Sequence, residues 1–581
     1  MHDDSALVER RLRRELAERL LPAMYPRTVP MTVEAWDTPG EPVPYAEAMA
    51  ALASQARPFR IGDKWGRPWG TTWFRFTADV PADWVGDGLE AVVDLGFHPD
   101  SAGFQSEGLV WTPEGPVQGI HPRRTGVPLP TATAGPLELV VEAASNPAFP
   151  MLGRRNGHLG SLSTAGDQPI YSLRQASLAV RDDDVFHLLL DIEVLLGLMS
   201  ALPQADKRRQ RVLRTLERAF DTIDMRRVGA TAAAARRVLE PALALHARDG
   251  AHTTVAVGHA HIDSAWLWPL RETVRKCART FASATRMIDR YPDYRFVCSQ
   301  AVQYHWMETQ YPALFERIRE RVATGQWQPV GGMWVEADMN LPSGESIVRQ
   351  LVHGQRYFES RFGVRCSEVW IPDVFGYPAS LPQIFVAGGC DRFVTQKLSW
   401  NKQNRFPHST FRWRGLDGSE VLTHFPPVDT YNATVVGEEL VFSEQNFKEH
   451  GWSDWSLMPF GHGNGGGGPT REMIERARRF ADLGTLTSQA RTKVGNRRCE
   501  RLLREAELWW AAGGDVPSEV VADLDRWWKE VLLQQFHDII PGSSITWVYE
   551  DAERVHAEVA AQVEASIDAA LARIAPSTRT V

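Results

Sequence analysis

Residues 258–268, with the sequence GHAHIDSAWLW, constrain the fold of this chain more than any other segment. The apolar run 255–257 before them predicts a strand, and residues 269–281 after them predict a helix. Because residues i and i+2 of a strand share one face, His261 and Asp263 point the same way. They would lie at the carboxyl end of a strand, where α/β barrels carry their chemistry. The pair predicts half of a mixed nitrogen–oxygen zinc site, and hydrogen bonding to loop amides is the alternative.

Length, charge and cysteine usage narrow the class of protein. The chain has 581 residues, which predicts about two to four domains. Its net charge is -8 with acids and bases interspersed, so we expect no nucleic-acid partner. Five scattered cysteines without C-x-x-C spacing predict free thiols in a reducing compartment.

Two further segments bear on localisation. The N-terminus alternates charged and apolar residues and lacks the apolar core of a signal peptide. The most apolar long stretch, 185–203, contains His187, Asp191 and Glu193, which makes it a core helix rather than a membrane span. We therefore expect a cytoplasmic protein without a membrane partner, and we leave homo-oligomer formation open.

The pattern of predicted elements changes along the chain. Residues 60–150 contain short alternating runs typical of an antiparallel β-sandwich, and residues 185–249 are helical. From about residue 252 strands and helices alternate, which predicts a parallel sheet or barrel, and after Gly495 the chain is helical. The expected fold class is a multidomain α/β protein with an N-terminal β-sandwich plus helices (1–250), a zinc-binding β/α barrel (251–487) and a helical-bundle domain that contributes to the active site (488–581).

Three more motifs are candidates for chemistry. Asp373, in WIPDVFGY, directly follows a predicted buried strand and suits a nucleophile or metal ligand; a helix N-cap is the alternative. His537 and Asp538, in QQFHDIIPG, end a predicted helix and would complete a site from a second domain; a helix C-cap is the alternative. The loop 460–470, FGHGNGGGGPT, permits close backbone approach to a ligand but lacks P-loop spacing, and a flexible linker is the alternative.

These motifs, together with GGMWVEAD and TQKLSWN, resemble glycoside hydrolase family 38, the retaining α-mannosidases. The resemblance is strongest to the bacterial and cytosolic–vacuolar branch and covers roughly residues 60–575, with the motifs in the family's order. It implies a fold of the family 38 type and hydrolysis of terminal α-mannosyl residues from a mannoside or oligosaccharide substrate.

The resemblance also implies a catalytic Zn²⁺ and its ligands. The matching positions are His261, Asp263, Asp373 and His537. Asp373 matches the nucleophile as well. In such a site Asp373 attacks the anomeric carbon, and a second carboxyl about 5 Å away protonates the leaving oxygen and then activates water.

Four further positions match residues that contact the sugar in the family. Trp266 and Asp538 match residues that hold the mannose. Phe375 and Lys397 match residues that line the pocket. These assignments follow from the resemblance alone.

The sequence departs from the family at the expected general acid/base. Asn464 stands where the family generally has Asp, and an amide cannot transfer the proton. His462, Glu336 and Asp338 are the candidate substitutes.

Two departures concern length. The segment between Arg479 and the motif at 488–493 is shorter than in the family, and the family's large C-terminal β domains do not follow the helical domain.

Two alternatives to an active mannosidase therefore stay open. One is a catalytically impaired or non-catalytic remnant that binds sugar or zinc, and the other is a zinc-dependent carbohydrate deacetylase. A zincin-type protease is disfavoured because the chain has no H-E-x-x-H motif.

Overall fold

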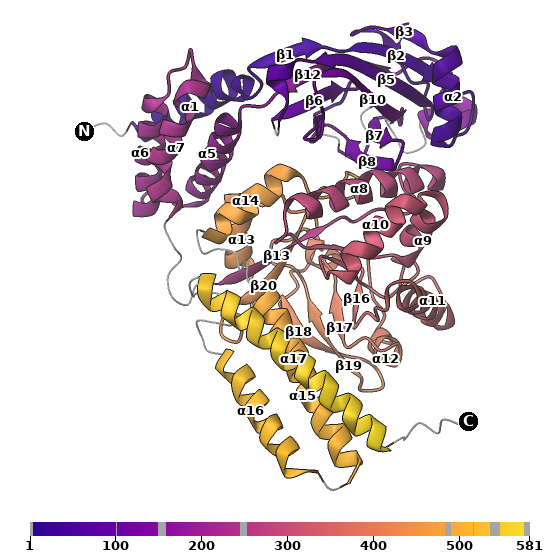
Figure 1. Ribbon diagram of the computed structural model, residues 1–581, viewed down its shortest axis with the longest axis vertical. Coiled ribbons are helices and arrows are strands. Elements are labelled where there is room, and N and C mark those ends of the chain that lie inside the picture. Colours follow the sequence, from indigo (N-terminus) through magenta and orange to yellow (C-terminus); the bar gives the residue numbers. More distant parts are fainter. Residues whose placement is uncertain are drawn as a thin grey trace. The chain divides into compact units, whose positions relative to one another are not determined.

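A computed structural model describes residues 4–86, 88–99, 102–148, 151, 158–244, 252–482, 490–514, 516–534 and 546–574. By its internal contacts the chain divides into two units, Met1–Thr485 and Leu486–Val581. The first unit contains a β-sandwich, a group of helices and an α/β domain, and the second is helical (Figure 1).

The β-sandwich consists of two antiparallel sheets. The first has the order β1-β12-β6-β9, with the bounds Arg27–Pro30, Gln175–Val180, Leu89–Asp94 and Gly126–Pro128. The second has the order β3-β2-β5-β10-β7-β8, with the bounds Arg57–Phe59, Thr32–Asp37, Thr71–Val80, Gly135–Ala144, Glu107–Thr112 and Gly115–Ile120. A short pair, β4 (Lys64–Trp65) and β11 (Tyr171–Ser172), lies beside them. The predicted β-sandwich is confirmed.

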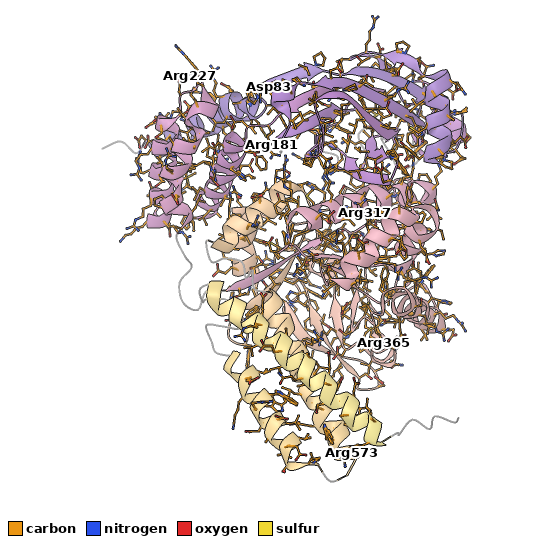
Figure 2. The ribbon with its side chains drawn as sticks, in the orientation of Figure 1. Asp83, Arg181, Arg227, Arg317, Arg365 and Arg573 are labelled. Atoms are coloured by element: carbon orange, nitrogen blue, oxygen red, sulfur yellow. The ribbon has the colours of Figure 1, made fainter. Side chains whose placement is uncertain are left out.

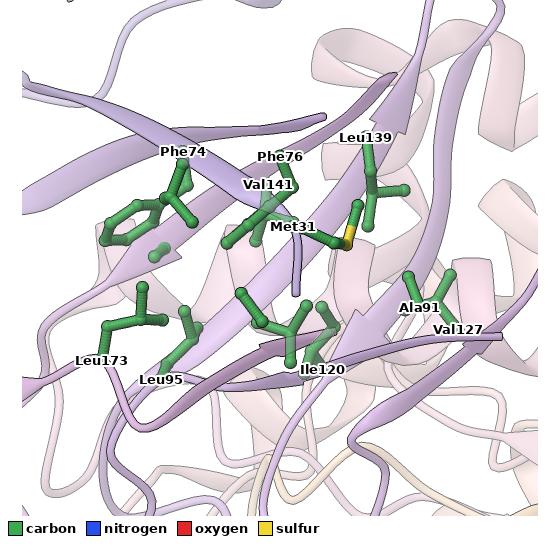
Figure 3. Close-up of a cluster of buried hydrophobic side chains, with 14 of the residues drawn as sticks. Met31, Phe74, Phe76, Ala91, Leu95, Ile120, Val127, Leu139, Val141 and Leu173 are labelled. Carbon is green, nitrogen blue, oxygen red and sulfur yellow. The ribbon is translucent and has the colours of Figure 1, made fainter. Parts of the chain in front are cut away.

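Alternation along the strands explains how the two sheets pack. Phe74 and Phe76 of β5 point between the sheets and meet Ala91 of β6 and Val127 of β9 in one buried cluster (Figure 3). Trp73 points the opposite way and is buried under helix α2 (Tyr45–Gln55). Around Trp73, strand β5 is therefore covered on both faces, by the facing sheet on one and by helix α2 on the other.

Four helices form the helical part of the N-terminal region. Their bounds are α1 Ser5–Glu15, α5 Asp183–Ala201, α6 Lys207–Thr222 and α7 Val228–Leu243, and a short helix α4, Leu162–Ala165, lies between α1 and α5 in the sequence. The Asp182 carboxylate accepts a hydrogen bond from the Val185 amide (3.0 Å) and caps α5. Helix α5 is the predicted core helix. In the described part of the chain, no helix has the length and apolar character that a membrane span requires.

The α/β domain alternates strands with helices as predicted. One parallel sheet has the order β15-β14-β13-β20, with the bounds Trp327–Pro329, Phe296–Cys298, Thr253–His259 and Trp455–Phe460. The other has the order β16-β17-β19-β18, with the bounds Glu368–Trp370, Arg392–Val394, Glu420–His424 and Thr410–Arg414. Only β18 runs antiparallel to its neighbour. Buried Val297, Val330 and Trp370 pack together with Val257 and Val394, so the two sheets share one interior.

Seven helices accompany these strands and place the site loops. Their bounds are α8 Leu270–Arg290, α9 Ala301–Gln310, α10 Pro312–Ala323, α11 Gly344–Phe362, α12 Leu381–Ala387, α13 Gly437–Asn446 and α14 Arg471–Asp482. The helix predicted at 269–281 is α8, and it continues nine residues further.

Helix α8 packs against the β-sandwich through buried charges. Three carboxylates face three cations there, and each charge lies within ion-pair distance of an opposite one; the members are Glu107, Glu142, Glu272, Arg275, Lys276 and Arg279. Nearby, Arg317 of α10 (labelled in Figure 2) donates to the Pro116 carbonyl at 2.9 Å. Complete pairing is needed here because an unpaired buried charge costs several kcal/mol, about 3–5 when one partner is removed.

The described residues of the second unit form three helices, as predicted. Their bounds are α15 Ala490–Ala512, α16 Ser518–Gln534 and α17 Thr546–Ile574. Leu503, Trp527 and Val563, one from each helix, meet in its buried cluster. Cys499 belongs to this cluster, and all five cysteines of the chain are free and buried.

Candidate metal centre and active site

The loop after β13 carries the first predicted ligands. β13 ends at His259, and Ile262 turns its carbonyl toward helix α9, where the side-chain amides of Gln300 (2.9 Å) and Gln303 (2.8 Å) donate to it. The Ser264 hydroxyl donates to the side-chain Oε1 of Gln300 at 2.9 Å. The loop is therefore held from both sides, which fixes the side chains on either side of Ile262.

Three carboxylates surround the buried imidazole of His261. Its Nε2 lies 3.1 Å from Asp263 Oδ1 and 3.8 Å from Asp373 Oδ2, and its Nδ1 lies 3.2 Å from Glu336 Oε2. The ligand atoms of His261, Asp263 and Asp373 all lie within 4.8 Å of one another. The structure therefore brings together three of the four residues predicted as metal ligands.

The charge of this cluster favours a cation. Burial lowers the pKa of His261, but the carboxylates of Glu336 and Asp263 raise it well above its usual value. Among the described residues, Lys397 also pairs with this group of carboxylates, through Asp373. Asp263 Oδ2 is buried and has no hydrogen-bond partner among the described residues. An oxygen donor left over beside an imidazole suits a divalent metal such as Zn²⁺.

Asp373 follows strand β16 and is held through one oxygen. Lys397 and the phenol of Tyr431 (2.6 Å) both donate to Oδ1, which leaves Oδ2 toward His261. Burial and the neighbouring Asp373 charge raise the pKa of Tyr431, so its hydroxyl stays protonated and donates. The alternative in which Asp373 caps a helix is wrong, because the next helix, α12, begins at Leu381 after Ser380 as its N-cap.

Aromatic rings flank Lys397. Its Nζ lies 5.0 Å from the ring centroid of Phe375 and 4.6 Å from that of Trp400. Trp400 also stacks on Tyr431 at 5.8 Å and donates to the Asp429 carbonyl at 2.8 Å. Phe375 is 73% exposed and Trp400 is 41% exposed, so both rings have faces open to a ligand.

Trp266, the second predicted sugar-contacting aromatic, lies on the same loop as His261 and is 48% exposed. Two further predicted residues, His537 and Asp538, lie outside the described residues.

The glycine-rich loop is packed, so the flexible-linker alternative is wrong. His462 and Gly468 exchange two backbone hydrogen bonds (3.0 and 2.9 Å) and close the loop. A Cβ at Gly461 would lie 2.2 Å from the His259 carbonyl, and one at Gly465 would lie 2.7 Å from a Lys276 side-chain carbon. The glycines are thus required by close packing.

Asn464 sits within this loop next to the metal-ligand loop. The Gly465 amide donates to the His261 carbonyl at 3.3 Å, which ties the two loops together. Asn464 has a φ of 52°, a left-handed conformation that Asn and Asp tolerate. Its Oδ1 is buried without a hydrogen-bond partner in the described parts of the chain.

The three candidate substitutes for the acid/base have other contacts. Burial, followed by the charge of Arg124, lowers the pKa of His462 to about 4, so it is uncharged near neutral pH. Asp338 accepts the amides of Asn340 and Leu341 (both 2.8 Å) and closes its own turn. Glu336 accepts a hydrogen bond from Ser299 and faces Nδ1 of His261. It therefore lies on the opposite side of the imidazole from Asp263 and Asp373, which face Nε2.

The low pKa of His462 predicts a pH dependence of stability. Its unfolded-state pKa is higher, so the unfolded chain binds more protons and stability falls as the pH drops from about 6.5 toward 4. The slope is about 1.4 kcal/mol per pH unit for this histidine. We expect the melting temperature of His462→Asn to decrease less between pH 7 and pH 5 than that of the wild type. His305→Asn, at a half-exposed histidine, should leave this decrease unchanged, and equal decreases in all three proteins would contradict the assignment.

Two site residues, Tyr431 and Gln300, have no local sequence signal. Trp400 and Glu336 lie within the motifs TQKLSWN and GGMWVEAD, but the motifs do not indicate their contacts with Lys397 and His261. Tyr431 and Gln300 contact site segments that are distant from them in the sequence, so the spacing along one chain does not indicate these contacts. Conservation in an alignment of related sequences would identify them.

Comparisons with known proteins agree with this architecture. Residues 251–499 match the glycosyl hydrolases family 38 N-terminal domain, residues 29–179 match the alpha-mannosidase jelly roll domain, and residues 483–574 match the alpha mannosidase middle domain. The chain is 39% identical to Alpha-mannosidase 2C1 of Homo sapiens over 88% of this chain and 52% of that protein. It is 34% identical to Alpha-mannosidase of Saccharomyces cerevisiae over 85% of this chain and 50% of that one. The chain thus spans about half the length of these relatives.

Proposed function

The chain belongs to glycoside hydrolase family 38, and we propose that it acts as a zinc-dependent retaining α-mannosidase that removes terminal α-mannosyl residues from oligosaccharides. One observation carries this proposal. The ligand atoms of His261, Asp263 and Asp373 lie within 4.8 Å of one another, while Lys397 and Tyr431 hold the other oxygen of Asp373. A carboxylate oriented at a metal site suits nucleophilic attack at an anomeric carbon.

We propose that His261, Asp263 and Asp373 hold Zn²⁺, with His537 as the fourth ligand. The nitrogen and oxygen donors, the unpartnered Asp263 Oδ2 and the excess of negative charge support this choice. When bound, the metal would act as a Lewis acid toward sugar hydroxyls.

The chain's own residues would then carry the two displacement steps. Asp373 forms a bond to the anomeric carbon as the bond to the leaving oxygen breaks, and water later cleaves this glycosyl ester. Lys397 and Tyr431 orient the attacking carboxylate. Trp266, Phe375 and Asp538 would bind the mannose. The leaving oxygen needs a proton, and the amide of Asn464 cannot supply it.

The metal assignment has a direct test. We expect purified wild-type protein to contain one zinc per chain by elemental analysis. His261→Ala should bind zinc at least about 100-fold more weakly, because even residues that merely support a ligand typically contribute about 10–100-fold. His305→Ala, at a half-exposed histidine of the same domain, is the control and should retain the metal. Zinc retained by His261→Ala, or a metal-free protein that hydrolyses aryl mannosides in chelator, would refute the assignment.

One alternative function is favoured by a specific observation. Asn464 at the acid/base position supports a catalytically impaired or non-catalytic protein that binds sugar or zinc. A carbohydrate deacetylase is the weaker alternative, and hydrolysis of an N-acetylated sugar in place of an aryl α-mannoside would favour it. The cytoplasmic location and the domain limits 1–250, 251–487 and 488–581 stay predictions.

A further inference from the structure

A loop of the β-sandwich reaches the aromatic side of the site. Phe104, between β6 and β7, meets the ring of Trp266 edge to face, with 5.2 Å between centroids and 80° between planes. It also contacts Trp268 at 5.8 Å. Trp268 is buried whereas Trp266 is half-exposed, so Phe104 supports the one tryptophan of this pair that is open to a ligand.

A buried lysine anchors this loop. Lys276 of α8 donates to the Gly103 carbonyl (2.9 Å) and to Glu107 (2.8 Å), and its Nζ lies 4.3 Å from the ring centroid of Trp268. The side chain is 1% exposed. An ammonium group buried this deeply holds its partners firmly, since an unpaired charge there would be costly.

The same loop also contacts the glycine-rich loop. A Cβ at Gly103 would lie 2.6 Å from the Asn464 carbonyl oxygen, so the two backbones touch. Residues 102–106 therefore contact both the segment that carries Trp266 and the loop that carries the acid/base position. One loop of the β-sandwich thus contacts two segments of the α/β domain, near Trp266 and Asn464, that are far apart in the sequence.

We propose that residues 102–106 form part of the sugar site and that Phe104 is a positioning residue that fixes the ring of Trp266 for stacking on the mannose ring. A half-exposed tryptophan on a loop has several rotamers, and an edge-to-face partner selects one of them. The β-sandwich would thus act on substrate binding from outside the α/β domain. This inference rests on the proposed function, in which Trp266 contacts the mannose.

The test compares KM and kcat for 4-nitrophenyl α-mannoside with the affinity for mannose by calorimetry. Phe104→Ala is expected to raise KM and the Kd for mannose by about two- to ten-fold, the usual strength of an aromatic pair, with a smaller change in kcat. Phe104→Tyr, which keeps the ring, should restore both values, whereas Phe104→Leu, which keeps only apolar bulk, should not. The double variant of Phe104→Ala with Trp266→Ala should be no worse than Trp266→Ala alone.

Trp84→Ala is the matched control, because Trp84 is another half-buried aromatic of the β-sandwich and packs against Arg27. It should leave KM and the mannose affinity at wild-type values. Unchanged KM and Kd in Phe104→Ala, rescue by Phe104→Leu, or additive losses in the double variant would each overturn the inference while the proposed function stands. A wild-type protein that neither cleaves the aryl mannoside nor binds mannose would overturn both.

Discussion

Asp373→Ala is expected to lower kcat for an activated aryl α-mannoside by about 10⁴-fold or more, because it removes the attacking carboxylate. The fold should survive, since Asp373 lies in the loop after β16 and its side chain is partly exposed. Steady-state rates and a melting curve measured by circular dichroism check both statements. Azide, a small nucleophile able to enter the space left by the carboxylate, should restore part of the rate.

The nucleophile role must be separated from the ligand role, because Asp373 is also a proposed metal ligand. Zinc content measured on the same preparation does so: loss of turnover with zinc retained assigns the loss to the missing nucleophile. Asp391→Ala is the control, as Asp391 is an exposed aspartate in the neighbouring strand region, paired with Arg392. Wild-type turnover in Asp373→Ala would remove this residue from the mechanism, and a fluorinated mannoside trapped on Asp373 would support the assignment directly.

The positions of His261, Asp263 and Asp373 just after strands could be predicted because strand patterns are local, whereas their assignment to one site came from the resemblance to the family. Strand periodicity itself does not orient His261 and Asp263, because β13 ends at His259 and both lie in the loop that follows. Two parallel sheets sharing an interior bring several strand ends together. The contacts of Glu336 and Tyr431 could not be predicted in this way. They come from loops whose paths depend on packing, and no spacing along the chain records which loops meet.

The glycine-rich loop shows a second limit of sequence reasoning. A run of glycines has the same composition whether it is a linker or a tightly packed turn. The difference lies in the neighbours: Gly461 and Gly465 meet the His259 carbonyl and Lys276, which are distant in sequence. Helix α8 shows a further limit. Its charged residues within the predicted range are buried in ion pairs with the β-sandwich, so polar residues do not mark an exposed face of this helix.

Asn464→Asp is expected to raise the rate on an unactivated α-mannobiose by about 10²–10⁴-fold, the usual contribution of general acid catalysis. The backbone accepts the substitution, since Asp, like Asn, tolerates the left-handed conformation at position 464. Rates on the disaccharide and on 4-nitrophenyl α-mannoside, measured side by side, provide the check.

The pattern across the two substrates decides between an impaired enzyme and a non-catalytic protein. Nitrophenolate leaves without a proton, so the aryl mannoside should gain much less than the disaccharide if Asn464 occupies the acid position. Asn432→Asp is the control, because its side-chain oxygen lies against Gly463 of the same loop and it adds the same charge at a different point. A gain shared by both substrates, or by both variants, would mean that added negative charge acts on the metal centre rather than as an acid. No gain on either substrate, with zinc and mannose still bound, would favour a family member that keeps the ligand-binding half of the site and has lost its chemistry.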